Sequence, residues 1–268
     1  MTDRLIVHCY NTGSVRPAWP TISSARAAHV YLLSETRLTK FGQSRFSRDL
    51  FQEQHAAAFG APLPPFADDP LVAQYGGVAC VVAPPFAPRP LYSHSSHWQK
   101  LYGTGRCAAC FVPINSGRTS FLFVALYGYP SSVGHGGKAG AHRQTTQLAE
   151  QLLAVLAQFN SIPVVIGMDL NDDIMDIQPF AAALALGQYH DVGAQCVQGV
   201  PGHTYFSAGT STRIDYCLCN SQAKALLHSF ELVPLDQCPA PTSKHAVSYT
   251  HLRAHETSLH LVCRLLLE

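Results

Sequence analysis

The stretch Ile162-Pro163-Val164-Val165-Ile166-Gly167-Met168-Asp169-Leu170-Asn171 decides how the rest of the chain is interpreted. Its apolar part is short and β-branched and has polar residues on both sides, which predicts a buried strand rather than a helix. Because side chains alternate across a strand, Asp169 and Asn171 face the same side at its end while Leu170 packs behind them. This pair can hold a water molecule or a metal ion. A strand followed by an Asp-rich turn is the structural alternative, and this stretch alone leaves it open.

The composition predicts one folded domain. The chain has 268 residues, of which 47% are hydrophobic, and that is enough for a substantial core. The formal net charge is only +1, so the composition does not indicate a strongly basic face that would bind nucleic acid. A polyanionic substrate would have to be held by a few local contacts. No apolar run approaches the roughly 20 residues of a membrane span, so we expect no membrane partner.

Cysteine usage and the N-terminus predict an intracellular protein. The nine Cys are an odd number and lack the dense spacing of a secreted disulfide scaffold. Residues 1–5 contain no apolar signal region. We therefore expect free thiols in a reducing compartment, whether nuclear or cytoplasmic.

Further apolar runs along the chain resemble the first one. Residues 11–27 and 131–140 are expected to be loops because of their Pro, Gly and Ser content, and residues 41–55 are expected to be partly helical. Apolar residues spaced by three and four predict a helix over 145–159. The remaining runs predict strands at 5–10, 28–33, 78–83, 107–114, 119–126, 213–220 and 227–234, with a hairpin around 115–118.

Polar side chains recur at or near the ends of these runs. If the strands lie side by side, their ends bring carboxylates, a phenol and an imidazole to one edge, a common way to build a site on a rigid scaffold. Asp215 interrupts an apolar run and needs a partner, since a buried unpaired carboxylate is costly. The residues concerned are Asn11, Glu35, Tyr127, Asp169, Asn171, Asp215 and His245.

The order of short motifs resembles the endonuclease/exonuclease/phosphatase superfamily, which has the deoxyribonuclease-I-like fold. Gly167–Asn171 resembles its Gly-Asp-Phe-Asn, with Met168 in the place of the second Gly. The resemblance covers residues 5 to about 247 and looks closest to apurinic-site and retrotransposon endonucleases. The other matching segments are Tyr10-Asn11, Leu33–Leu38, Gly76–Ala79, Val124–Tyr127 and Arg213–Tyr216.

This resemblance implies an α/β fold, a four-layered sandwich of two central mixed β-sheets flanked by helices. It also implies a phosphoesterase that uses Mg²⁺ or Mn²⁺, with Glu35 and Asn11 at the metal. In the same way, Asp169 would orient or deprotonate the attacking water, and Asn171 would position that water or the phosphate. Asp215 would pair with His245 beside the phosphate. Tyr127 would donate to the phosphate, with Tyr129 as the alternative.

Two features depart from the family pattern. Lys244 stands where the family has an Asp, and an ammonium there would repel a metal ion at short range. Either Lys244 turns outward, or it binds phosphate as a fixed cation, or the enzyme is degenerate. Residues 248–268 do not resemble the closing strand of the family; they resemble translated adaptor read-through. We therefore expect the domain to span 1–247 and 248–268 to be a non-family tail.

The function that we expect is metal-assisted cleavage of nucleic-acid phosphodiester bonds by an endonuclease. Two alternatives stay open: a phosphatase of small phosphoesters of the inositol polyphosphate type, and a degenerate member that acts as a binding module. Arg37, Arg106, His142 and Arg143 contact phosphate only if they face the same edge. The sequence does not define the oligomeric state.

Overall fold

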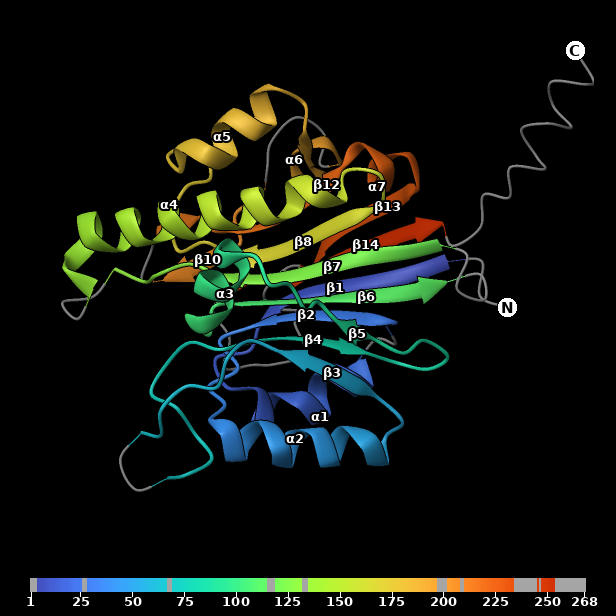
Figure 1. Ribbon diagram of the computed structural model, residues 1–268, viewed down its shortest axis with the longest axis vertical. Helices are drawn as coiled ribbons and strands as arrows, with labels where there is room; N and C mark the ends of the chain where they lie inside the picture. Colours follow the sequence, from blue (N-terminus) through green and yellow to red (C-terminus); the bar gives the residue numbers. More distant parts are fainter. Residues whose placement is uncertain are drawn as a thin grey trace, which may run out of the picture.

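The computed structural model consists of two six-stranded sheets packed face to face, with helices on both outer faces (Figure 1). The structure describes residues 4–25, 28–66, 69–114, 119–131, 135–196, 202–207, 210–233, 245 and 247–253. Both sheets are mixed, with one parallel pair each among antiparallel neighbours. The four-layered sandwich predicted from the sequence is confirmed.

The first sheet carries the N-terminal strands of the chain. Its order is β13 (Leu227–Val233), β14 (Val247–Arg253), β1 (Arg4–Asn11), β2 (Val30–Ser34), β4 (Val78–Val82) and β3 (Ala56–Phe59). Helices α1 (Val15–Ala25) and α2 (Lys40–Gln52) cover its outer face (Figure 1). Trp19 and Phe46 of these helices pack with Tyr31 and Leu33 of β2 in a buried cluster.

The second sheet carries the middle of the chain. Its order is β5 (Arg89–Pro90), β6 (Cys107–Ile114), β7 (Thr119–Tyr127), β8 (Val164–Asp169), β12 (Asp215–Asn220) and β9 (Tyr189–Asp191). Its outer face packs on α3 (Ser96–Gly103), α4 (Gly137–Leu156) and α5 (Gln178–Ala185). The short elements α6 (Val192–Cys196), β10 (Tyr205–Ser207), β11 (Thr210–Thr212) and α7 (Ser221–Ala225) complete the described structure.

The strand β8 packs closely against the facing sheet at Gly167. All six of its residues are buried, as the apolar run predicts. A Cβ on Gly167 would lie 2.5 Å from the Cys9 sulfur and 2.9 Å from Cβ of Leu32. Glycine at this position therefore lets β8 pack directly against β1 and β2, which brings the end of β8 beside the end of β1.

Both segments that the composition predicts to be loops, residues 11–27 and 131–140, are partly helical. Residues 15–25 form α1 despite Pro20 in its interior, because Val15, Trp19 and Ile22 recur at helical spacing and bury one face on the first sheet. Helix α4 begins at Gly137 rather than near 145. A Cβ on Gly140 would lie 1.9 Å from the carbonyl oxygen of His135, so glycine lets the first turn close.

The expected domain boundary at 247 does not coincide with the edge of the sheet. Residues 248–253 lie in β14, which pairs with β1 on one side and β13 on the other. Residues 248–253 of the expected tail thus belong to the first sheet, and the boundary between domain and tail stays a prediction. Residues 254–268 lie outside the described residues, and the read-through origin of the tail stays a prediction. No helix among the described residues is long and apolar enough to cross a membrane.

Candidate active site

The register of the second sheet aligns three of the expected site residues. Tyr127 at the end of β7 is the register partner of Asp169 on β8, and Asp169 is the register partner of Asp215 on β12. Asn11 ends β1 of the facing sheet, so the site lies where strands of both sheets end. Asn11 Nδ2 donates to Oδ2 of Asp169 at 2.6 Å across 158 residues of sequence.

Asp169 is the most enclosed carboxylate of the group. Its side chain is 1% exposed, and its second oxygen accepts a hydrogen bond from the Asn171 backbone N–H at 3.0 Å. Burial and then the nearby charge of Asp215 raise the pKa of Asp169 to about 7, although His245, Asn11 and the Asn171 amide oppose the change. Asp169 therefore exchanges a proton near neutral pH in the metal-free protein.

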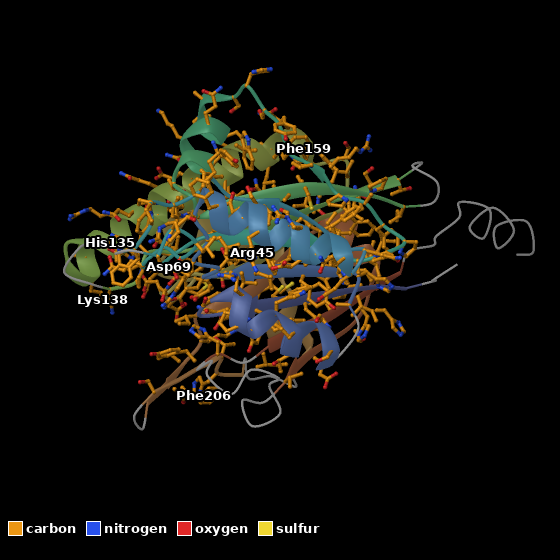
Figure 2. All side chains as sticks on the ribbon, turned by 90° about the horizontal axis from the view of Figure 1, so that it is seen from below. Arg45, Asp69, His135, Lys138, Phe159 and Phe206 are labelled. Atoms are coloured by element: carbon orange, nitrogen blue, oxygen red, sulfur yellow. The ribbon has the colours of Figure 1, made fainter. Side chains whose placement is uncertain are left out.

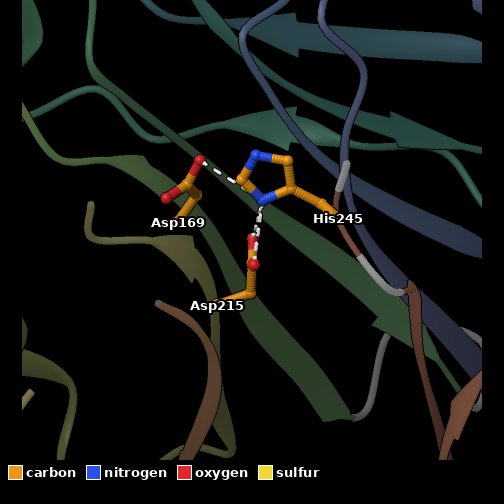
Figure 3. A group of neighbouring side chains, drawn as sticks. All are labelled: Asp169, Asp215 and His245. Carbon is orange, nitrogen blue, oxygen red and sulfur yellow. Dashed lines mark hydrogen bonds and ion pairs between the residues drawn. The ribbon is translucent and has the colours of Figure 1, made fainter. Parts of the chain in front are cut away.

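His245 lies between the two aspartates (Figure 3). Its Nδ1 is 3.0 Å from Oδ2 of Asp215 and 3.9 Å from Oδ2 of Asp169, and its ring packs at 5.0 Å from the ring of Tyr205. Burial by itself would lower the pKa of His245, but Asp215, Asp169 and Glu35 more than reverse this and raise it to about 9. The ring is therefore an imidazolium at neutral pH that donates its Nδ1–H to Asp215.

Glu35 follows β2 in a tight turn and is paired with Arg37. Both residues have φ of +54°, and Arg37 donates to Oε1 of Glu35 through Nε at 3.1 Å and also through Nη2. The Gly76-Gly77 turn supports this geometry, since Gly76 O accepts from Arg37 N at 2.8 Å and Gly77 O accepts from Thr36 N at 3.1 Å. Glu35 influences His245 through space, but the contacts of its carboxylate are with Arg37.

Asn171 and Tyr127 complete the group. Asn171 has a φ of +55°, a conformation that Asn tolerates, and its Nδ2 donates to the Gly128 carbonyl at 3.3 Å. Tyr127 is 3% exposed, and burial together with the charges of Asp169 and Glu35 raises the pKa of Tyr127 well above its ordinary value. The phenol therefore stays neutral and can act as a hydrogen-bond donor.

The donor set fits a hard divalent cation. Glu35, Asp215 and, when it is deprotonated, Asp169 offer carboxylate oxygens, the ligands that Mg²⁺ and Mn²⁺ prefer. One ligand atom from each of Asp169, Asp215 and His245 lies within 4.8 Å of the others. His245 is excluded as a ligand while it is an imidazolium, because both ring nitrogens then carry protons. Glu35 could hold a metal only if Arg37 moved aside.

The structure separates the four basic residues that sequence offered as phosphate contacts. Arg37 reaches the site through Glu35, whereas Arg106 is buried under Tyr127 and Tyr129. His142 pairs with Asp172 at 2.8 Å, and Arg143 is exposed on α4. Lys244, which replaces the Asp of the family motif, lies outside the described residues.

Two residues that support the site have no signal in the local sequence. Thr204 Oγ1 accepts hydrogen bonds from the backbone N–H groups of Ile214 and Asp215 at 3.1 and 2.9 Å, which fixes the start of β12. Tyr205 forms an isolated β-bridge with His245 and packs against its ring. Both contacts join segments that are far apart in sequence, so no spacing pattern could have revealed them.

The two mixed sheets and their flanking helices form an α/β sandwich of the deoxyribonuclease-I-like kind. No protein-family model and no curated protein sequence matches the chain. Among solved structures, the chain is similar to NExo from Neisseria, described as a 3′ phosphatase bound to a product DNA hairpin. The two align with a TM-score of 0.70 at 14% identity, and the alignment covers 92% of this chain and 99% of that one.

Two further solved structures give the same result. The AP endonuclease LMAP from Leishmania major aligns with a TM-score of 0.69 at 13% identity, over 95% of this chain and 89% of that one. The catalytic domain of human Nocturnin, with a bound sulfate anion, aligns with a TM-score of 0.64 at 13% identity, over 93% of each chain. At these identities the likeness establishes the fold and not the activity.

Proposed function

We propose that this protein is a phosphoesterase that uses Mg²⁺ or Mn²⁺ and cleaves phosphodiester bonds in nucleic acid as an endonuclease. The observation that carries the proposal is the convergence of Asn11, Asp169, Asp215 and His245 at strand ends of both sheets. A buried carboxylate, an imidazolium and an amide within contact of each other are the groups that water attack on a phosphate requires.

Asp169 is the base in this proposal. Its pKa of about 7 lies near the working pH, which is the best compromise between being deprotonated and being able to accept a proton. The amide of Asn11 and the backbone N–H of Asn171 hold one oxygen each, so the carboxylate has a fixed orientation. As water attacks, its oxygen bonds to phosphorus and its proton passes to Asp169, while the bond from phosphorus to the leaving oxygen breaks and that oxygen takes up a proton from solvent.

Positive charge and hydrogen-bond donors would stabilise the phosphate oxygens. Asp215 keeps His245 protonated, and the imidazolium lies beside Asp169 where the negative charge of the transition state develops. Tyr127, a neutral phenol at the same strand edge, would donate to the phosphate. Glu35, with Asn11, would hold the divalent cation, which when bound withdraws charge from a phosphate oxygen and steadies the leaving oxygen.

The nucleic-acid substrate is supported by the relatives in structure. NExo is described with a product DNA hairpin and LMAP as an AP endonuclease, and both align along almost the whole of this chain. The alternative is a phosphatase of small phosphoesters. NExo is described as a 3′ phosphatase, which is in line with phosphatase chemistry, but its product is DNA and not a small molecule. The pairing of Arg37 with Glu35 favours a third candidate, a binding module with little activity, because it competes with the metal.

The test is cleavage by the full chain in Mg²⁺ or Mn²⁺ of three substrates: an abasic-site duplex, a supercoiled plasmid and an inositol polyphosphate. Asp169→Asn, His245→Gln and Glu35→Gln should each lower turnover by about a hundredfold or more, as expected for loss of the base, of the imidazolium and of a metal ligand respectively. Glu150→Gln, the same chemical change at an exposed position of α4, is the matched control and should have no effect.

The three candidates differ in outcome. Nicking of either DNA that depends on Asp169 supports the endonuclease. Phosphate release from the inositol polyphosphate alone supports the small-molecule phosphatase. If no substrate turns over at any metal concentration but DNA still binds, the binding module stands and the endonuclease proposal is rejected.

A further inference from the structure

A pocket of about 280 Å³ opens next to the proposed active site. We call it the Tyr129 pocket; it is lined by the loop around Leu63–Phe66, by Tyr75 and Gly76, and by Arg106 and Tyr129. Two contacts connect it with the site: Gly76 O accepts a hydrogen bond from the N–H of Arg37, the partner of Glu35, and the Arg106 guanidinium lies over the rings of both Tyr127 and Tyr129. A group in this pocket would lie beside a phosphate held at Tyr127.

The walls of the Tyr129 pocket suit a flat group. Its lining includes the rings of Tyr75, Tyr129 and Phe66, and Tyr75 and Phe66 are 42% and 49% exposed. His135 contacts both tyrosines edge-on, with ring centroids 5.9 Å and 5.0 Å away. In Figure 2 this histidine lies at one end of the molecule, the end from which α4 starts. Aromatic faces held in this way are stacking platforms for planar ligands.

A buried cation stiffens the pocket and links it to the active site. Arg106 is 5% exposed, and its guanidinium lies 3.9 Å from the ring centroid of Tyr129 and 5.0 Å from that of Tyr127. Its Nη1 donates to the Gly128 carbonyl at 2.7 Å, which fixes its orientation. One side chain thus contacts both the strand-end Tyr127 and the wall of the Tyr129 pocket, and it gives the pocket a positive charge.

The other cleft beside the site has the opposite charge. It measures about 1010 Å³ and begins at Asn171, and its lining contains four carboxylates and two full cations. The carboxylates are Asp172, Asp173, Asp176 and Asp191, and the cations are Lys138 and Arg213. Among the described residues that line the Tyr129 pocket there is no carboxylate and one Arg. A polyanionic chain leaving the site is therefore favoured on the side of the Tyr129 pocket.

We infer that the Tyr129 pocket binds one unstacked nucleobase of a single-stranded nucleic acid, next to the phosphate that is cleaved; this inference rests on the proposed function. The volume lies just below the range of about 300–1,000 Å³ that is usual for whole small-molecule ligands, so it suits one base rather than a dinucleotide. A base inside a duplex cannot enter without leaving the stack. The substrate is therefore single-stranded at this position, or frayed.

The experiment measures base stacking separately from cleavage. Single-stranded trinucleotides with 2-aminopurine on either side of the central phosphate are titrated with the full chain in EDTA, where no cleavage occurs. One of the two isomers should lose fluorescence on binding, and its abasic counterpart should bind about tenfold more weakly. Tyr129→Leu should abolish the quenching and weaken binding to the same extent, whereas Tyr129→Phe should retain both. Met175→Ala, in the cleft with the carboxylates, is the control and should change neither.

Two results would overturn the inference: equal affinity for the base-containing and abasic strands, or quenching that survives in Tyr129→Leu. Should that variant fail to fold by circular dichroism, the comparison of base with abasic strand in the unaltered protein decides by itself. Cleavage of a longer single-stranded oligonucleotide and of plasmid in Mg²⁺, measured in parallel, reports on the proposed function. Cleavage of either with no preference for the base rejects this inference alone, and base stacking without cleavage of either rejects the endonuclease alone.

Discussion

Replacing Asp215 with Asn should remove the positive charge of His245 at neutral pH. The carboxylate of Asp215 lies 3.0 Å from Nδ1 of His245, and it is the chief influence that raises the pKa of this imidazole against the effect of burial. The Asn side chain keeps an oxygen that can accept from Nδ1 but carries no charge. With burial still acting, the pKa of His245 in Asp215→Asn should fall to about its ordinary value of 6.5 or below.

The size of the effect follows from the pKa of His245. It is raised from 6.5 to about 9, and one pH unit corresponds to about 1.36 kcal/mol, so the charged imidazole stabilises the fold by about 3 kcal/mol. Because the pKa is higher in the folded state, this stabilisation is complete below 6.5 and is lost as the pH rises through about 9. Asp215→Asn should lose almost all of it, and its stability should vary little over that range.

Two measurements on the metal-free protein in EDTA check this. The ring proton of His245, assigned by its absence in His245→Gln, is followed by NMR against pH in the unaltered protein and in Asp215→Asn. Urea unfolding at about pH 6, 8 and 10 gives the stability of both. A His245 ring that titrates near 6.5 in the unaltered protein, or near 9 in Asp215→Asn, would refute the reasoning. Either result would show that the carboxylate of Asp215 does not raise the pKa of the His245 ring.

Three other predictions concern the site and its support. Burial and Asp215 raise the pKa of Asp169 from 3.8 to about 7, so the stability held by its protonated form is lost as pH rises through about 7. In EDTA, the free energy of unfolding of Asp169→Asn should therefore gain up to about 4 kcal/mol relative to that of the unaltered protein between about pH 4 and pH 8. A difference in urea unfolding that stays constant with pH would contradict this. Arg37→Gln should tighten Mn²⁺ binding about three- to tenfold, measured by calorimetry, because it frees the Glu35 carboxylate from a partly exposed ion pair. Arg45→Gln, at an exposed position of α2 (Figure 2), is the control and should leave Mn²⁺ affinity unchanged. Equal affinities in the two variants would exclude competition by Arg37. Gly167→Ala should cost about 1–3 kcal/mol in urea unfolding because its methyl group meets Cys9 and Leu32, whereas Gly103→Ala, with open space around it, should be neutral; similar losses in both would argue against close packing at Gly167.

The strands could be predicted from the sequence because the pattern that marks a strand is local. β8 is a run of six buried residues, and the alternation of side chains is enough to predict that Leu170 is buried in the core behind the site. Helix α1 is an element that local composition does not predict. Its prolines indicate a loop, whereas in the fold the burial of Trp19 against the first sheet outweighs the cost of Pro20.

Candidate site residues could be named from strand ends, but their pairing could not. Sequence predicted that Asp215 needs a partner, and the family resemblance pointed to His245; the structure brings the two together at 3.0 Å. Sequence expected Glu35 and Asn11 at a metal. In the structure Asn11 donates to Asp169 and Glu35 pairs with Arg37, contacts that depend on side-chain directions in tight turns, and the metal role of both residues stays a prediction.

The amino-acid sequence by itself determined the period of each strand and the polar residues at its end, because these follow from short-range alternation and from the need to bury apolar side chains. The class of fold was predicted from the resemblance of its short motifs to a known family. Only the tertiary structure decided which strand ends meet. The register that aligns Tyr127, Asp169 and Asp215, the contact of Asn11 with Asp169 across 158 residues, and the insertion of β14 beside β1 all depend on how two sheets pack. Packing energy is shared among many residues far apart in the chain, so no short stretch encodes it.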